Sequence, residues 1–461
     1  ALSATSNEPD VSYNVDANGS YVDDLFVFNS AKGKIHITSY NGSATLQTSQ
    51  HGLDAFRFSA SVSPSEVAID NFNMVGIYDP ANPPSQSPND SGGVQFGGAG
   101  TPLSGRKTVN NCYIGGFDKC IWIGGQWPGQ SHQNVFMSDV YGEKWHDYGV
   151  FGGFSGNVGF AGVALRQPDN TKNSGGQNQS PYYADQGPVR LSEQDGPITY
   201  NLVDMVSRTD WAAGSPDTNR TMQQCLRNNG GRNGIDQELN IARMRSQGGQ
   251  LKVHVETAGN SIGERTKTVV DKVHHTITDH SSPGVEMDRG GSTFRNIISV
   301  CPNNAPGRIG GMTRHYEMSA APRSTAESLA SRMEYYNYTH VDLRSNANAQ
   351  SRTGNAKKYD TGVGSFSDRY IANGIEYVPN QTPSLTGDLP LNQTPQWAAD
   401  YTGERWKTNP VDTTRGHGSE VSATYRPEPG SAAIGSATGK QAIDDFYGTL
   451  RSKNTRGAVE N

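Results

Sequence analysis

Short runs in which apolar and polar residues alternate recur along most of the chain. Clear examples lie at residues 35–38, 67–72, 134–137, 251–255 and 294–298, and turns rich in Gly, Ser and Asn separate them. Alternation with a period of two indicates a β-strand with one buried face. The sequence therefore predicts a long series of short strands.

The spacing of these runs favours stacked strands over paired hairpins. One turn of short strands cannot bury its apolar face alone, whereas stacked turns bury it together. Asn at a sharp bend tolerates the left-handed backbone conformation, and stacked Asn side chains form hydrogen-bonded ladders. The pattern predicts an all-β fold, a right-handed single-stranded parallel β-helix (a solenoid). A β-sandwich would need more regular spacing and more hairpin turns.

The same pattern divides the chain into two parts. We expect a parallel β-helix with an N-terminal cap over residues 1–375, and a C-terminal extension over 376–461 that packs on the solenoid or caps it. The repeated pattern itself begins near residue 20. Insertions in a solenoid leave at its corners and can wall a groove. Three long polar insertions are expected, at residues 80–100, 167–186 and 214–224.

Composition agrees with a thin core and many turns. Only 33% of the 461 residues are hydrophobic and 54 are Gly. The net charge of -6 argues against a nucleic-acid partner, and no apolar stretch is long enough to insert into a membrane. The four cysteines match no zinc-binding pattern. Buried thiols are the favoured interpretation, and a Cys112–Cys120 disulfide is the alternative if the protein is extracellular.

Two segments resemble the pectin-lyase-like superfamily of right-handed parallel β-helices. Residues 19–37, with Gly19-Ser20-Tyr21 and then Gly33-Lys34-Ile35, are similar to the opening coil of such proteins. Residues 426–435, 444–451 and 457–460 are similar to their closing segment. The superfamily contains polysaccharide lyases, glycoside hydrolases, epimerases and phage tailspikes. The paired Asp residues of its polygalacturonase branch are not found in this sequence, nor is a clean match to the Lys and Arg motifs of its pectate and alginate lyases.

The resemblance implies an extracellular protein that binds and cleaves a polysaccharide. A lyase acting on a uronate-containing glycan is favoured over a hydrolase. One alternative is a phage tailspike or receptor-binding protein that recognises a host surface glycan from the virion surface. Another is a structural or adhesive surface protein without catalysis. A secreted enzyme is expected to be a monomer and a tailspike a homotrimer.

Ionisable residues concentrate between Arg190 and Arg289, and three kinds of chemistry fit them. A lyase needs a base, for which Lys252 and His254 are candidates, and a clamp for the uronate carboxylate, for which Arg227 and Arg243 are candidates. It also uses a cation, and Ca²⁺ could be held by carboxylates. The predicted calcium ligands are Asp236, Glu238 and Glu256.

The other two kinds of chemistry need different residues. A hydrolase needs two carboxylates across the glycosidic bond, and Glu256, Glu286 and Asp288 are the candidates. A non-catalytic binder needs aromatic platforms, and the candidates are Trp122, Trp127, Trp145 and Trp211. Against all three stands a structural interpretation, in which outward charges pair between neighbouring coils.

Overall fold

The structure is a computed structural model of the chain. It describes residues 2–4, 10–23, 26–28, 33–58, 64–79, 91–97, 105–124, 132–167, 188–192, 198–209, 225–228, 237–248, 251–252, 266–277, 285–288, 292–301, 313–317, 333–342, 355–358, 369–377, 433–452 and 454–460. This part of the chain is all-β, which confirms the predicted fold class at that level. Among these residues, no helix has the length and apolarity needed to cross a membrane.

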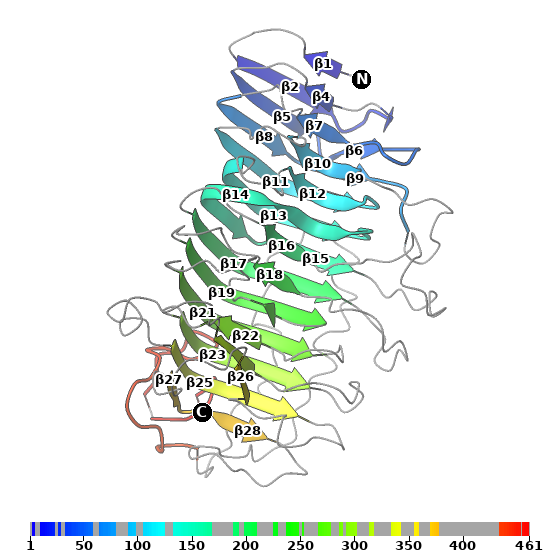
Figure 1. Cartoon of the computed structure of the whole chain (residues 1–461). Coiled ribbons are helices and arrows are strands. Elements are labelled where there is room, and N and C mark those ends of the chain that lie inside the picture. Colours follow the sequence, from blue (N-terminus) through cyan, green and yellow to red (C-terminus); the bar gives the residue numbers. More distant parts are fainter. Residues whose placement is uncertain are drawn as a thin grey trace.

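The described strands form three ladders that run side by side through a tall stack (Figure 1). We call them ladders A, B and C, and we call one strand from each a layer. Within a ladder every strand pairs in parallel with its counterparts in the adjacent layers, as in β4 with β7 and β7 with β10. The chain thus visits A, B and C in turn and then moves to the next layer.

Ladders A and B each contain one strand from every layer. Ladder A consists of β1 (Leu2–Ala4), β4 (Phe26–Phe28), β7 (Phe56–Phe58), β10 (Gly92–Phe96), β12 (Lys119–Ile123), the first part of β14 (Tyr148–Ala161), β16 (Val189–Ser192), β18 (Leu226–Asn228), β20 (Leu251–Lys252), β22 (Val285–Asp288), β24 (Thr313–Glu317) and β26 (Asn355–Lys358). Ladder B consists of β2 (Asp10–Asp16), β5 (Lys34–Tyr40), β8 (Glu66–Asp70), β27 (Arg369–Ala372) and the second part of β14. It also contains the first parts of β11 (Arg106–Gly115), β13 (His132–Glu143), β17 (Ile198–Thr209), β19 (Gln237–Gly248), β21 (Thr266–Ile277), β23 (Ser292–Cys301) and β25 (Met333–Asp342).

Ladder C continues each B strand after a sharp bend. Its separate strands are β3 (Tyr21–Val22), β6 (Ala44–Gln47), β9 (Phe72–Val75), β15 (Ala164–Gln167) and β28 (Ile375–Tyr377). In the other layers the second halves of the long strands from β11 to β25 serve as ladder C.

From the layer of β8 and β9 onward, the bend between ladders B and C has one residue in the left-handed conformation in each layer. Asn is the most frequent residue there, as the sequence pattern predicts, because its short polar side chain tolerates positive φ. From β8–β9 onward this B–C corner comprises Asn71, Asn111, Asp139, Gly162, Asp204, Arg243, Lys272, Asn296, Asn337 and Asn373, with φ between 51° and 69°.

Stacked aromatic rings fill the interior of the first layers. Phe28 stacks on Phe58 with centroids 4.9 Å apart, and Phe58 stacks on Phe96 at 5.3 Å. Phe26 and Phe56 form a parallel stack at 5.0 Å. All five side chains are buried. Because these positions alternate along ladder A, each layer places its apolar side chains directly over those of the layer before.

The C-terminal residues 433–460, which we call the strap, pack against the last layers (Figure 1). Corner residues hold its backbone: Asn337 Oδ1 accepts from Ala442 N at 2.8 Å, and Asn373 Nδ2 donates to Lys440 O at 2.9 Å. Lys272 Nζ lies 2.5 Å from Asp444 Oδ2. The side chains of one corner ladder therefore recognise a segment that follows more than fifty residues later in the sequence.

Three expectations from the sequence need correction. The expected insertion at residues 80–100 contains strand β10, which the Gly-rich sequence of Gly92 and Gly93 conceals although Val94 and Phe96 are buried. Ordered pairing begins before residue 20, because β2 already pairs with β5 over its whole length. The alternative Cys112–Cys120 disulfide is not formed, since both residues are buried free thiols. The other two expected insertions lie almost wholly outside the described residues.

Candidate functional site

A cluster of four ionisable side chains lies where the chain enters ladder A in two adjacent layers. Lys119 Nζ lies 2.5 Å from Asp118 Oδ2 and 3.3 Å from Asp147 Oδ2. His146 Nδ1 lies 2.8 Å from Asp118 Oδ1. We call these four residues the Asp147 cluster. One lysine thus bridges two carboxylates, while the imidazole contacts the inner carboxylate from its other side.

Strand register brings these residues together. Lys119 pairs with Tyr148 at the start of β12 and β14, so the preceding residues Asp118 and Asp147 stack on each other. The backbone supports this stack, since Asp147 N donates to Asp118 O at 2.8 Å. The cluster is a repeated position of successive layers, not a sequence motif.

Burial separates the two carboxyl groups. The Asp118 side chain is 5% exposed, whereas that of Asp147 is 29% exposed and reaches solvent. Burial, only partly offset by the charge of Lys119, raises the pKa of Asp147 to about 6. Burial also acts to raise the pKa of Asp118, but the hydrogen bond from His146 and the charge of Lys119 outweigh it and hold that pKa below its usual value.

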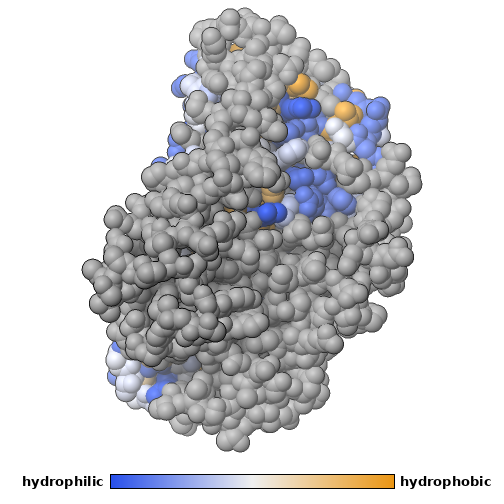
Figure 2. All heavy atoms as spheres, in the orientation of Figure 1, coloured by the Kyte–Doolittle hydropathy of each residue, from blue (hydrophilic) through white to orange (hydrophobic). Residues whose placement is uncertain are grey.

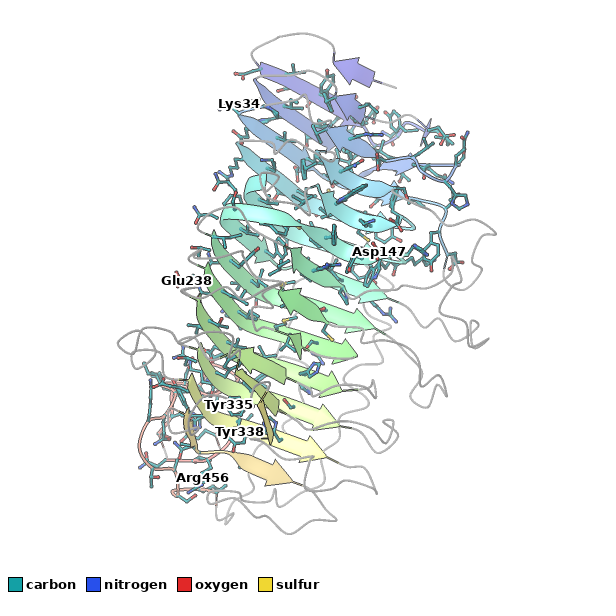
Figure 3. All side chains as sticks on the ribbon, in the orientation of Figure 1. Lys34, Asp147, Glu238, Tyr335, Tyr338 and Arg456 are labelled. Carbon is teal, nitrogen blue, oxygen red and sulfur yellow. The ribbon has the colours of Figure 1, made fainter. Side chains whose placement is uncertain are left out.

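These environments assign different states to the two acids. Titratable neighbours with pKa values pushed apart mark a site able to donate or accept a proton. Asp118 stays ionised and holds Lys119 and His146 in place. Asp147 can exchange a proton near neutral pH. Figure 3 labels Asp147 at the right-hand edge of the stack, where Figure 2 shows hydrophilic residues gathered in the upper half of the molecule.

Aromatic and cationic groups lie next to the cluster on ladder A. Lys119 Nζ lies 4.8 Å from the Trp122 ring, and Arg190 Cζ lies 5.3 Å from the Phe151 ring. The Arg190 guanidinium also donates to Tyr148 OH at 2.6 Å. Trp122 and Arg190 are partly exposed, while Tyr148 and Phe151 are buried.

One register column runs through these residues and continues down ladder A. Strand pairing aligns Trp122 with Phe151 and Phe151 with Arg190. The next positions in the column are charged residues that the sequence predicts as candidate catalytic residues. In order from β7 the column reads Arg57, Gln95, Trp122, Phe151, Arg190, Arg227, Lys252, Glu286 and Arg314. Along the column, two aromatic residues are therefore followed by three consecutive cationic residues.

The structure brings together some of the predicted catalytic residues. Arg227, Lys252 and Glu286 occupy adjacent positions in this column, and Asp288 lies two residues further along β22. Arg243 lies elsewhere, at the B–C corner, where its guanidinium makes two 2.7 Å hydrogen bonds to Asp204. This pairing between neighbouring layers is the one that the structural interpretation predicts. His254 lies outside the described residues.

The predicted calcium ligands are only partly described. Glu238 lies on ladder B and accepts a hydrogen bond from Asn240 at 3.4 Å. Figure 3 shows Glu238 at the opposite edge of the stack from Asp147. Asp236 and Glu256 lie outside the described residues. Within the described part of the chain, no three His, Cys, Asp or Glu side chains are grouped as a metal site requires.

Among the predicted aromatic platforms, the prediction for Trp145 is wrong, whereas Trp122 remains a candidate. Trp145 is fully buried in the hydrophobic core and is not available to a ligand. Trp127 and Trp211 lie outside the described residues.

Sequence reasoning missed the Asp147 cluster. Its signal was present as the similar segments Phe117-Asp118-Lys119 and Trp145-His146-Asp147-Tyr148, each of which precedes an apolar strand. Only the register between layers shows that the two segments stack.

Comparisons with known proteins add no further likeness: no family model, no curated protein and no solved structure matches the chain.

Proposed function

We propose that this protein is a right-handed parallel β-helix of the pectin-lyase-like kind that binds an anionic polysaccharide along ladder A and cleaves it at the Asp147 cluster. The favoured reaction is β-elimination on a uronate-containing glycan. Such glycans lie outside cells, so the proposed place of action is extracellular, for a secreted enzyme or a virion spike. The resemblance noted in the sequence and the parallel pairing of all three ladders support the fold.

The register column of ladder A carries the functional proposal. Strands within a sheet lie about 4.8 Å apart, which is close to the length of one hexose unit. A glycan lying along the stack would therefore meet a new side chain of this column with each sugar. In this proposal Trp122 is the stacking surface and Arg190 pairs with a carboxylate, and the two lie in one register column. Arg227 and Lys252 follow in the same register.

The partly exposed groups fit an elimination better than a hydrolysis. Elimination needs a cation beside the uronate carboxylate and one group that takes the proton from C5. Arg190 and Asp147 would supply these. The C5–H electron pair forms the C4–C5 double bond, and the C4–O4 pair leaves with the oxygen, which water protonates. Hydrolysis needs a second accessible carboxylate, whereas Asp118 is buried and bound to both His146 and Lys119.

A depolymerisation screen tests this proposal. The full chain is incubated with alginate, pectin, ulvan and bacterial capsule glycans, with and without Ca²⁺. Reducing ends and the ultraviolet absorbance of unsaturated uronates are then followed together. We expect both signals to rise on at least one uronate polymer. Asp147→Asn should lower kcat by about 100-fold or more, as loss of a general base does, and Arg190→Gln should raise KM.

Asp139→Asn is the matched control, because it removes an exposed acid at the B–C corner, away from ladder A. Its activity should equal that of the wild type. Reducing ends without absorbance would replace elimination by hydrolysis. Glycan binding without cleavage would leave ladder A as a recognition surface, as in a tailspike or adhesin. No binding to any anionic polymer would overturn the proposal.

A further inference from the structure

The strap makes its furthest contacts with the layer of β21, through the turn at residues 444–450. Asp444 and Leu450 form an antiparallel bridge, and Asp445 Oδ1 accepts from Tyr447 N and Thr449 N at 2.9 Å each. Asn296 Nδ2 donates to Asp444 O at 3.1 Å. The turn is thus a small, internally bonded unit that rests on two neighbouring layers. We call it the strap tip.

A histidine lies beneath the strap tip. The Phe446 ring packs edge-on against the His274 ring, with centroids 6.5 Å apart, and both side chains are fully buried. In ladder C, His274 pairs with Arg245 of β19 on one side and with Ile298 of β23 on the other. The imidazole is therefore enclosed by an apolar ring, an apolar side chain and a permanent cation.

The remaining ionisable groups around His274 come from β21, β23 and the strap. Asp271 and Arg295 form an ion pair at 3.0 Å, and Lys272 is paired with Asp444. His275, the next residue, hydrogen-bonds to Ser246 at 2.8 Å between Nδ1 and Oγ. The strap contributes Asp444, Asp445, Arg451 and Glu460.

We propose that the strap is an acid-releasable latch, in which protonation of His274 opens the strap tip while the layers beneath it remain folded. The charged imidazole would lie against the Phe446 ring and next to the Arg245 guanidinium, and neither position tolerates a new buried cation. Opening the tip brings water to the imidazole and relieves both penalties. This inference does not depend on the proposed glycan chemistry.

The direction of the pH dependence follows from linkage. Burial, then the charge of Arg245 and then that of His275, hold the pKa of His274 well below its usual value in the closed state. In the open state the imidazole recovers a pKa nearer the unperturbed value of about 6.5. The open state therefore binds more protons as the pH falls below about 6.5, and acid favours opening. Above that pH the latch stays closed.

The strap is suited to local opening because its tip presents few apolar groups to the layers. Leu450 in the tip and Ile443 just before it are 72% and 78% exposed, so Phe446 is the apolar side chain that the tip buries against the layers. The returning arm is held more firmly. Arg451 is partly buried and donates to Gly457 O and Ala458 O at 3.0 Å, and Ala458 N donates to Thr339 Oγ1 at 3.0 Å. Opening is expected to start at residues 444–450 and to leave this arm in place.

Amide hydrogen exchange of the full chain tests the latch. Exchange is measured at about pH 7.5 and about pH 5.5, on either side of the histidine range, and corrected for the intrinsic pH dependence of amide exchange. Peptides from the strap tip should exchange roughly tenfold faster at the lower pH, because pH 5.5 lies about one unit below the unperturbed histidine pKa. Peptides from β11 to β14 should not change.

His274→Leu, which cannot take up a proton, should remove most of the acid response of the tip. His340→Leu is the matched control, because it removes a buried histidine that contacts Tyr335 in the interior, and its tip should respond like the wild type. Phe446→Ala should open the tip already at neutral pH and leave a smaller acid response, which keeps the test valid if His274→Leu does not fold.

Three results would overturn the inference. The tip of the wild type could exchange equally at both pH values. The tip and the core could respond together, which would show global acid unfolding. The response could survive His274→Leu and disappear in Glu460→Gln, which would assign the switch to the strap carboxylates.

Discussion

One interior column of ladder C changes its chemistry halfway down the molecule. In the upper layers it contains Leu46, Met74, Ile114 and Leu165, with Gly142 between the last two. In the lower layers the aligned positions are Ser207, Ser246, His275, Ser299 and His340. All nine side chains are at most 1% exposed. The same parallel backbone therefore supports both an apolar and a polar interior.

The two halves must be stabilised in different ways. Apolar burial contributes about 25 cal/mol per Å² without any directional requirement. Buried polar groups contribute only when they are hydrogen-bonded. In the lower half His340 Nε2 lies 2.8 Å from Tyr335 OH, and Ser207 Oγ donates to Cys225 O. The upper half thus depends on shape, whereas lower positions such as Ser207 and His340 depend on specific bonds.

The B–C corner differs between the halves in the same manner. In the upper layers Asn111 Nδ2 donates to Asn71 Oδ1 at 3.1 Å, so the corner bonds to itself. In the lower layers Asn296, Asn337 and Asn373 bond to the strap instead. The corner Asn residues adopt the left-handed bend in both halves, and next to the strap their side chains also bind the strap.

The largest expected contrast comes from truncating one interior side chain in each half. Phe58→Ala should lower the free energy of unfolding by about 3–5 kcal/mol, because it removes a ring that stacks on both Phe28 and Phe96. Ser299→Ala should change it by less than about 1 kcal/mol, since its buried Oγ has no hydrogen-bond partner among the described residues. Urea unfolding measures both. Equal losses would show that the halves are stabilised alike.

The pH dependence of stability should belong to the lower half. Burial lowers the pKa of His340 to about 3 in the folded protein, whereas the unfolded chain titrates near 6.5. The unfolded state therefore binds more protons between these values, and stability falls as the pH drops from about 6.5 towards 3. His340→Gln should flatten this decline by about 1–3 kcal/mol. Denaturant midpoints measured across this pH range, with Phe58→Ala as a variant that keeps the full slope, provide the test.

The smallest effect is expected at the exposed part of the corner. The Arg243–Asp204 pair is more than 30% exposed on both sides. Asp204→Asn should therefore cost less than about 1 kcal/mol, and the loss should shrink in high salt. Thermal unfolding at low and high ionic strength measures it. A larger loss of stability that does not depend on salt would show that this pair stabilises the fold as much as the strap-binding Asn residues do.

Much of the layered organisation could be read from the sequence. The alternation at residues 35–38 and 67–72 gave strands β5, β8 and β9 with the predicted buried face. Strand β10 escaped notice because Gly92 and Gly93 break the alternation, although the neighbouring layers supply the apolar contacts that hold the strand. A local sequence pattern therefore identifies a strand only when the residues of that strand alternate between apolar and polar.

The candidate site was far less predictable. Charge density pointed to residues 190–289, whereas the best-described cluster joins Asp118 and Lys119 to His146 and Asp147. Neither segment is unusual alone. Their chemistry arises because register stacks one carboxylate directly on another, and burial then moves the pKa of Asp147 towards neutrality.

The sequence by itself determined the all-β class, the repeated strand and the Asn-rich corner, because each depends on neighbouring residues and on a period of two. Only the tertiary structure decided which residues meet across layers. The stacking of Asp118 on Asp147, the docking of the strap on Lys272 and Asn296, and the covering of His274 by Phe446 all join residues 29 to 172 positions apart. Such contacts depend on the length of every intervening turn and loop, and local sequence patterns do not encode that length in a readable form.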